Sequence, residues 1–348
     1  MAVSVSGVTI SEPVFWPHPL LAIETSCDET AAALVCGRKV LSNVVASQLD
    51  LHAQWGGVVP EAASRAHVEA ILPVIQEALL PLAGEKPSGI VVTTNPGLVG
   101  ALSVGLTAAK GLASAWGLPL LGVNHLEGHV MALCAEELGE IPPLPMLVLV
   151  VSGGHTELVL VREWGKFELI GQTLDDAAGE AFDKAARLMG LGTPGGKVVQ
   201  EAAKSGNPKR YQLPRGLKKD PFNFSFSGLK TAVLRLVEAE GNNLNIPDAC
   251  ASLQAVIVRT LTDKATAALD EIDCQSFGLA GGVSANVALR ESFAFVASKR
   301  GIPFYCPPFD LCTDNAGMIG LAGSFRFARG ERSDWSLDVS ASGALSGL

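Results

Sequence analysis

Hydrophobic residues in this chain gather into short runs, and two stretches of the sequence arrange these runs in the same way. Residues 20–35 read LLAIETSCDETAAALV, and residues 146–161 read MLVLVVSGGHTELVLV. In each stretch two apolar runs flank a tip of Ser, Thr, Gly and acidic residues, which is the pattern of a β-hairpin with a polar turn. A third strand-like segment follows each hairpin, at 39–47 and at 166–174. The sequence therefore predicts two similar three-stranded beginnings.

The order of elements after each hairpin repeats as well. After the first we expect a helix, a strand, a helix, a strand and a helix, at 60–79, 89–94, 99–116, 118–123 and 124–138. After the second the same order is expected at 176–191 and 247–272 (helices), 276–280 (strand), 284–301 (helix), 302–306 (strand) and 313–330 (helix). Strands that alternate with helices form a largely parallel sheet covered by helices, with ligands outside the carboxyl ends of the strands.

This repetition predicts an α/β protein made of two β-β-β-α-β-α-β-α halves that face each other across a cleft. We place the halves at 20–142 and 143–348, after an N-terminal tail at 1–19 that we expect to be loose. An insertion at about 192–245 interrupts the second half. Six of the 26 Lys and Arg residues fall within 204–219 of this insertion. The segment is either an ordinary solvated insertion or a contact surface for an anionic partner.

Composition and charge narrow the class of protein. Hydrophobic residues make up 48% of the chain and charged residues 18%, which is enough apolar material for a globular core. The net charge of −9 argues against binding nucleic acid by bulk electrostatics, so such binding must be local or shared with partner proteins. The seven cysteines form no CxxC pair and are typical of reduced thiols in the cytoplasm. Residues 1–19 lack the features of a signal or transit peptide, and Lys110 interrupts the longest weakly polar region, so we expect no membrane span.

Two histidines in the segment NHLEGH suggest a metal site. His125 and His129 are spaced i, i+4 and share one helix face, so both can reach one ion, although chance pairing or capping gives the same spacing. Glu127 lies about 200° round the helix and faces away, which excludes the water-activating glutamate of an H-E-x-x-H protease. The repeat places Asp314 at the equivalent point of the second half, as a third ligand from the opposite wall of the cleft. Two His and one carboxylate suit Fe(II) or Zn(II).

Three glycine turns favour a nucleotide site in the same cleft. Ser152, Gly153 and Gly154 form one hairpin tip, and TPGGK at 193–197 is a second turn. In the third, LAGGVSAN, a strand precedes two glycines, Ser284 as the expected helix cap and Asn286 in the first turn. Glycine turns let a phosphate approach backbone N–H groups, although each of them also suits an ordinary tight turn.

The helix expected at 176–191 carries a row of carboxylates. Asp176, Glu180 and Asp183 fall at i, i+4 and i+7 on one face. Such a row is either a solvated face or a contact for ribose hydroxyls or a cation.

These segments together resemble the bacterial TsaD family of tRNA N6-adenosine threonylcarbamoyltransferases, formerly described as glycoprotein endopeptidases. The resemblance runs from about Leu20 to the C-terminal region and rests on IETSCDET, GGVVPEAASRAH, HLEGH, VSGGHTEL, DDAAGEAFDKAARLMGL, FSFSGLKT, AGGVSAN and CTDNAGM. It implies the duplicated actin-like, sugar-kinase-like (ASKHA, ribonuclease-H-like) fold. It also implies transfer of threonylcarbamoyl from threonylcarbamoyl-adenylate to N6 of the adenosine 3′ to the anticodon, in tRNAs that read codons beginning with A.

The resemblance also implies roles for particular residues. His125, His129 and Asp314 would hold one divalent metal, for which we expect Fe(II) in preference to Zn(II). The adenylate would be bound by Val150, Val151, Ser152, Gly153, Gly154, Asp183, Gly196 and Asn286. Asp28 would lie near the reacting centre, with no role assigned.

The same resemblance implies partners. We expect tRNA and proteins similar to TsaB and TsaE, in the cytoplasm and away from membranes. The alternative hypotheses are a small-molecule kinase or an actin-like ATP-binding module of the same fold, and neither of them explains the histidine pair.

Overall fold

The structure is a computed structural model that describes residues 12–53, 55 and 57–345. Its strands are β1 (Leu20–Glu24), β2 (Glu29–Cys36), β3 (Lys39–Ser47), β4 (Gly89–Asn95), β5 (Leu120–Asn124), β6 (Met146–Val151), β7 (Thr156–Glu163), β8 (Lys166–Gln172), β9 (Ser276–Ala280) and β10 (Phe304–Tyr305). Its helices are α1 (Leu49–Ala53), α2 (Pro60–Ala78), α3 (Val99–Trp116), α4 (His125–Met131), α5 (Ala178–Leu188), α6 (Gly195–Ala203), α7 (Ser227–Glu240), α8 (Ile246–Glu271), α9 (Val287–Arg300) and α10 (Ala316–Ala328).

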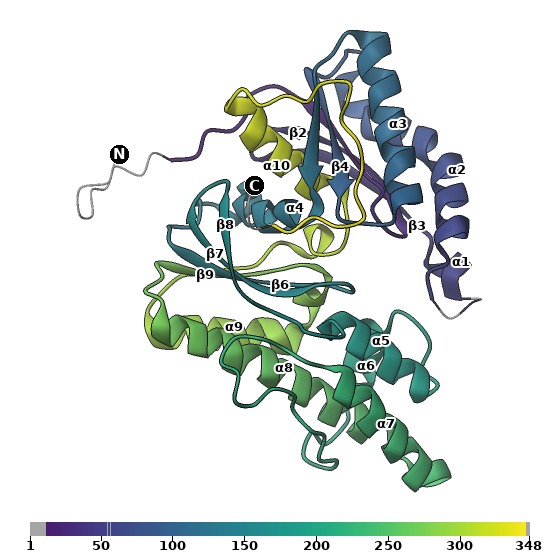
Figure 1. The fold of residues 1–348 in the computed structure, drawn as a ribbon, viewed down its shortest axis with the longest axis vertical. Helices are drawn as coiled ribbons and strands as arrows, with labels where there is room; N and C mark the ends of the chain where they lie inside the picture. The colour runs from purple at the N-terminus through teal and green to yellow at the C-terminus, as the bar shows by residue number, and fades with distance from the viewer. Residues whose placement is uncertain (1–11, 54, 56, 346–348) are drawn as a thin grey trace. The chain divides into compact units, whose positions relative to one another are not determined.

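The two predicted copies are present and have the same strand order. One five-stranded sheet runs β3-β2-β1-β4-β5, and the other runs β10-β9-β6-β7-β8, so each places its third, second, first, fourth and fifth strand side by side (Figure 1). In the first sheet β1 pairs antiparallel with β2 and parallel with β4. In the second, β6 and β10 both pair parallel with β9. The predicted α/β class and the duplication are confirmed.

Helices on both faces of the first sheet explain why its central strand is apolar at every position except the last, Glu24. All five residues of β1 are buried. Figure 1 shows α2 and α3 on one face of this sheet and α10 on the other. Leu21 and Ile23 belong to an apolar cluster with residues of α2 and α3, whereas Ala22 lies close to Gly320 of α10. Because side chains alternate along a strand, a strand covered on both faces reads as a continuous apolar run.

The last helix, α10, belongs to the first sheet. It packs against β1, β2 and α4, and glycines make the close approach possible. A Cβ on Gly320 would lie 2.3 Å from Cγ2 of Val35, and one on Gly323 would lie 2.4 Å from Cγ2 of Val91. The first compact unit therefore comprises the described residues up to Ile141, Val161–Glu168 and the chain from Asp314 onward. The division at 142/143 drawn from the sequence is wrong for this last segment, because α10 covers the first sheet.

The second compact unit comprises Pro142–Leu160 and Leu169–Thr313. Leu147, Leu149 and Val151 of β6 point into an apolar cluster that they share with α5, α8 and α9. The insertion contains two helices that the sequence reading missed, α6 and α7. In α7 the i, i+4 pair Leu229 and Val233 is buried, and this spacing was the available signal.

The segment before β1 is anchored along part of its length. Trp16 donates its backbone N–H to Ser324 O of α10 at 3.0 Å, and its indole N–H to Ser88 Oγ at 2.9 Å. The expectation of a loose tail is therefore wrong for these last residues, and residues 1–11 lie outside the described part of the chain.

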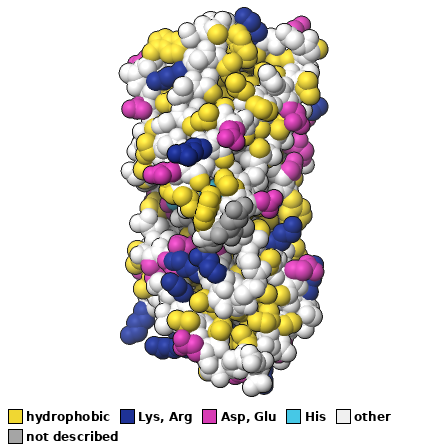
Figure 2. Space-filling view, turned by 90° about the vertical axis from the view of Figure 1, so that its right-hand side faces the viewer, with side chains coloured by type: hydrophobic (Ala, Val, Ile, Leu, Met, Phe, Trp, Pro, Cys, Tyr) yellow, Lys and Arg dark blue, Asp and Glu magenta, His cyan; other side chains and the backbone are white. Residues whose placement is uncertain are grey.

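The surface mixes residue types. Figure 2 shows apolar side chains interspersed with charged ones over the face in view. None of the helices in the described residues is long and apolar enough to cross a membrane. The weakly polar region that Lys110 interrupts holds α3 and β5, of which β5 is buried throughout, whereas α3 is buried along one face only.

Candidate metal centre

The histidine pair lies on a short helix whose start is fixed by a cap. Strand β5 ends at Asn124, whose Oδ1 accepts hydrogen bonds from Leu126 N (2.8 Å) and Glu127 N (3.3 Å). An asparagine in this position satisfies N–H groups that have no partner within the helix, so α4 begins at His125. His125 and His129 then lie one turn apart, with ring centroids separated by 4.8 Å. The predicted spacing on one helix face is confirmed.

Asp314 reaches the same place from the start of α10. Asn315 caps this helix by accepting from Met318 N at 3.0 Å, and Asn43 of β3 accepts from Gly317 N at 3.2 Å. Asp314, the residue before the cap, is thereby held over α4. Its Oδ1 lies 3.4 Å from Nε2 of His125 and 3.3 Å from Nε2 of His129. All three residues belong to the first compact unit, so Asp314 does not come from an opposite wall as the sequence reading expected.

The chemistry of the three side chains fits a divalent metal. One ligand atom from each residue lies within 4.8 Å of the others. The side chain of His129 is fully buried, and neither of its ring nitrogens has a hydrogen-bond partner of good geometry among the described residues. Leaving a buried polar group unsatisfied costs about 1–3 kcal/mol. A cation bound at Nε2 would satisfy one of the two nitrogens, and two imidazoles with one carboxylate form a common Fe(II) or Zn(II) ligand set.

The charges of the three residues act on one another. Burial lowers the pKa of His129 and favours its neutral form, which is the form that binds metals. Burial also opposes charge on His125, but the carboxylates of Asp314 and Glu24 outweigh it and raise the pKa of His125 well above its usual value. Burial likewise opposes charge on Asp314, but the two histidines hold the pKa of Asp314 well below its usual range.

A buried glutamate that the sequence reading overlooked orients His125. Glu24, at the end of β1, is fully buried, and its Oε2 lies 3.1 Å from Nδ1 of His125. The same carboxylate accepts from Thr93 Oγ1 (2.5 Å) and Ser26 N (2.5 Å). A carboxylate on the second nitrogen of a histidine fixes the ring's tautomer and direction, so that Nε2 is left for the ion. The available signal was a glutamate in an otherwise apolar strand.

Replacing Glu24 with glutamine should weaken metal binding about 10-fold to 100-fold, which is the usual effect of losing such a supporting carboxylate. The amide cannot keep all three hydrogen bonds, because one oxygen becomes an NH₂ donor. Titration against a chelator of known affinity measures the change, with the exposed Glu136→Gln as control. Wild-type metal affinity in Glu24→Gln would show that this carboxylate does not orient the ring.

Glu127 points away from the cluster, as its position on the helix predicted. Its Oε2 lies 3.4 Å from Nη1 of Arg326 on α10. Burial raises the pKa of Glu127 to about 7, and Arg326 only partly opposes this. Glu127 is therefore part of the α4–α10 contact, and the structure excludes the protease arrangement.

The polar tip between β1 and β2 brings two more carboxyl groups towards Asp314. Burial raises the pKa of Glu29 to about 10, with further contributions from the charges of Asp314 and Asp28. Asp28 itself is half-buried, and its carbonyl oxygen accepts from Gln48 N at 3.0 Å. The structure thus places the Asp28 carboxylate beside the thiol of Cys27 and the carboxyl group of Glu29, in the electrostatic range of Asp314.

In the second unit, the end of β6 meets two glycine-containing turns. A Cβ on Gly281, which has a φ of 88°, would lie 2.5 Å from the carbonyl oxygen of Val151. A Cβ on Gly179 would lie equally close to the carbonyl oxygen of Ser152. Only glycine allows these approaches, which bring the Val150–Gly154 tip beside the start of α5 and the turn after β9.

The other predicted adenylate residues lie on the helices around this tip. Oδ1 of Asp183 accepts from Gly195 N at 2.7 Å and so ties α5 to the start of α6, where Gly196 lies. Asn286 caps α9 by accepting from Leu289 N at 3.0 Å, and its amide donates to Gln254 Oε1 at 2.9 Å. The expectations that Ser284 is the cap and Asn286 lies within the first turn are therefore wrong. Ser284 belongs to a 3₁₀ turn, Gly282–Ala285, because the chain makes one more tight turn before the helix starts.

Three of the predicted glycines border open space. A Cβ on Gly153, Gly154 or Gly196 would meet no atom within 4 Å. Their backbones are therefore free to approach a ligand.

The carboxylate row expected on α5 does not form. The helix begins at Ala178, so Asp176 lies before it, and Lys184 pairs with both Asp176 and Glu180 at 2.8 Å. Lys184 thus compensates the charges that were expected to be solvated or to bind a cation or ribose.

Taken by its fold, the chain falls in the class of duplicated α/β proteins with an actin-like core. Solved structures of this class share its fold but little of its sequence. HypF from T. kodakarensis has a TM-score of 0.58 at 14% identity and covers 91% of this chain and 49% of its own. (R)-2-hydroxyglutaryl-CoA dehydratase component A from Acidaminococcus fermentans has a TM-score of 0.51 at 13% identity and covers 89% and 99%. At these identities the likeness concerns the fold alone.

Sequence comparison gives the family. A family model described as "TsaD: tRNA N6-adenosine threonylcarbamoyltransferase" matches residues 39–321. Proteins of that name from Anaeromyxobacter dehalogenans (strain 2CP-C) and Symbiobacterium thermophilum are each 52% identical to this chain. The first covers 90% of this chain and 95% of its own length, and the second 92% and 95%. The chain belongs to the TsaD family, and the resemblance drawn from its motifs is confirmed.

Proposed function

We propose that this chain is the threonylcarbamoyl-transferring enzyme of t6A biosynthesis. It transfers the threonylcarbamoyl group from threonylcarbamoyl-adenylate to N6 of the adenosine 3′ to the anticodon, in tRNAs that read codons beginning with A. The family match over most of the chain carries this proposal. No observation favours the kinase or the ATP-binding module.

His125, His129 and Asp314 would hold one divalent ion, Fe(II) in preference to Zn(II). When bound, the ion supplies a Lewis acid that polarises the carbonyl of the activated substrate. The mixed anhydride is already activated, so the chain needs no nucleophilic side chain. Its own residues orient the ligands, through Glu24 and the caps of α4 and α10, and present backbone N–H groups near the charge that develops.

The adenylate would lie on the glycine turns of the second unit. The open space at Gly153, Gly154 and Gly196 supports this assignment, as does the convergence of the β6 tip with the start of α5. Asn286 supports it less directly, because its side chain is engaged in capping α9 and in the bond to Gln254.

Replacing Gly154 with valine should weaken binding of a non-hydrolysable adenylate analogue at least about tenfold. The new Cβ would meet no protein atom within 4 Å, so the free energy of unfolding should change by only about 0.5 kcal/mol, as for ordinary surface substitutions. Calorimetry of the analogue together with urea unfolding measures both quantities. If the variant kept the wild-type affinity and an unchanged fold, the adenylate would not bind at this tip.

The proposal also includes partner proteins similar to TsaB and TsaE, and it places the reaction in the cytoplasm. The net charge of −9 supports a tRNA surface that is shared among proteins, because one acidic chain offers little bulk attraction for RNA. Transfer assays with this chain alone and with the two partners added test this, and equal activity in both would remove the partners from the reaction.

The activity is tested by mass analysis of nucleosides from bulk tRNA after depletion of this protein. N6-threonylcarbamoyladenosine should fall and should return when the wild-type chain is supplied. An unchanged level would remove the proposed function.

A further inference from the structure

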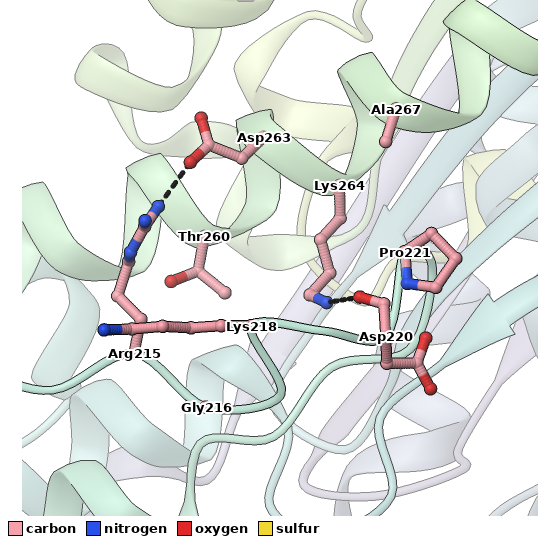
Figure 3. A pocket seen from close by; sticks show the side chains of 9 residues that line it. All are labelled: Arg215, Gly216, Lys218, Asp220, Pro221, Thr260, Asp263, Lys264 and Ala267. Atoms are coloured by element: carbon pink, nitrogen blue, oxygen red, sulfur yellow. Dashed lines mark hydrogen bonds and ion pairs between the residues drawn. The ribbon is translucent and has the colours of Figure 1, made fainter.

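The basic insertion forms a pocket against α8. Lys264 of α8 donates from Nζ to the carbonyl oxygens of Leu217 (2.9 Å) and Asp220 (2.5 Å), and Arg215 pairs with Asp263 one position earlier on the helix. These contacts hold the loop over α8 around a cavity of about 170 Å³ (Figure 3). We call it the insertion pocket. It is lined by residues of the loop, among them Arg215, Lys218 and Asp220, and by Thr260, Asp263 and Lys264 of α8.

Both acidic groups of the insertion pocket are already engaged. Asp263 is paired with Arg215. The carboxylate of Asp220 accepts from the backbone N–H groups of Phe222 (3.0 Å) and Asn223 (2.8 Å), and from Asn223 Nδ2 (3.0 Å). Asp220 keeps its negative charge, because these donors are neutral, and this charge attracts Lys264.

Two lysines of the pocket form no ion pair within the described residues, although the charge of Asp220 acts on Lys264. Lys264 is only 7% exposed, and its hydrogen-bond partners are two neutral carbonyl oxygens. An ammonium group has three donors, so one remains for another acceptor. Lys218 is exposed and makes no ion pair or hydrogen bond within the described part of the chain. The lining of the insertion pocket therefore holds three basic side chains against two acidic ones, and this excess of one positive charge, with Lys264 buried beside it, favours an anion.

The size and place of the pocket suit a phosphate group. A water molecule takes about 30 Å³ in the liquid, so the cavity has room for several water-sized groups such as the oxygens of a phosphate. A metal ion is excluded by the lysines, and an apolar ligand by the buried ammonium group. The exposed Lys218 at its edge, followed by the exposed Lys219, leads from the pocket onto the surface, which suits a chain of phosphates better than a single one.

We propose that the insertion pocket binds a backbone phosphate of the RNA substrate through Lys218 and Lys264. This inference rests on the proposed function, which supplies the RNA. Of the two interpretations of the insertion, the proposal favours a contact surface for an anionic partner over an ordinary solvated segment. It also explains how a protein with a net negative charge can bind RNA locally.

Binding of unmodified tRNA to the full chain, measured over a range of salt concentrations, tests the proposal. Lys218→Gln should bind several-fold more weakly, and its plot of log K against log salt should be shallower by about 0.7–0.9, the value for one lost phosphate contact. Lys299→Gln on α9 removes the same charge from an exposed site outside the pocket, where Nζ lies 5.4 Å from the Phe295 ring, and should keep the wild-type slope. Lys264→Met should behave like Lys218→Gln if unfolding curves show that it is folded.

The outcomes separate this inference from the proposed function. Equal slopes for wild type, Lys218→Gln and Lys299→Gln would overturn the pocket assignment, and so would absence of tRNA binding by the wild-type chain. Binding of free phosphate alone would also overturn the assignment. In that case inorganic phosphate would raise the melting temperature of wild type but not of Lys218→Gln, and the two proteins would have the same tRNA salt slope. The nucleoside assay after depletion decides the function independently of all three results.

Discussion

Asp314→Ala should lose its bound metal and reduce threonylcarbamoyl transfer at least about 100-fold, more than the 10-fold to 100-fold typical for a supporting residue, because it removes a direct ligand. Its carboxylate is the only acidic group of the cluster and lies within 3.4 Å of both Nε2 atoms. Without it, two imidazoles on one helix must hold the ion alone. Elemental analysis and a single-turnover transfer assay measure the two losses.

Glu127→Gln is the matched control for this variant. Glu127 lies between the two histidines in sequence, but its carboxylate contacts Arg326. This variant should retain metal and activity, whereas in an H-E-x-x-H protease the same change would abolish activity with metal still bound. Full metal content in Asp314→Ala, or full activity in His125→Ala, would refute the proposed ligand set.

Gly320→Ala should lower the free energy of unfolding by about 1–3 kcal/mol, the usual cost of overpacking a core. Its Cβ would lie 2.3 Å from Cγ2 of Val35, a short and stiff side chain that is itself fully buried. The helix must move outward, and Asp314 at its start moves with it. We therefore expect weaker metal binding together with the loss of stability, measured by urea unfolding and by chelator titration.

Gly111→Ala is the control for this second variant. Gly111 lies within α3 of the same unit, and a Cβ there would meet no atom within 4 Å. Alanine is the better helix former by about 0.8–1 kcal/mol, so this change should stabilise the protein slightly and leave the metal affinity unaltered. If both substitutions changed the free energy of unfolding equally, the close approach of α10 to the first sheet would not be the reason why position 320 requires glycine.

Local patterns in the sequence were sufficient to predict those features that depend on residues close together along the chain. Strand and helix periods predicted both sheets and most helices, since they reflect which faces of an element are buried. The spacing of His125 and His129 and the direction of Glu127 follow from helix geometry alone. The helices of the insertion were missed because turn-forming residues around them masked a short apolar period.

The tertiary structure decided the features that join distant segments. The repeat in the sequence assigns α10 to the second half of the chain. In the structure the glycines and apolar residues of α10 pack on the first sheet. This packing places Asp314 beside His125 and His129 in the first unit. The contact of Glu24 with His125 and the contacts of Lys264 with the insertion likewise join residues that are far apart in the chain. A sequence pattern records which faces are buried, whereas only packing determines what each face is buried against.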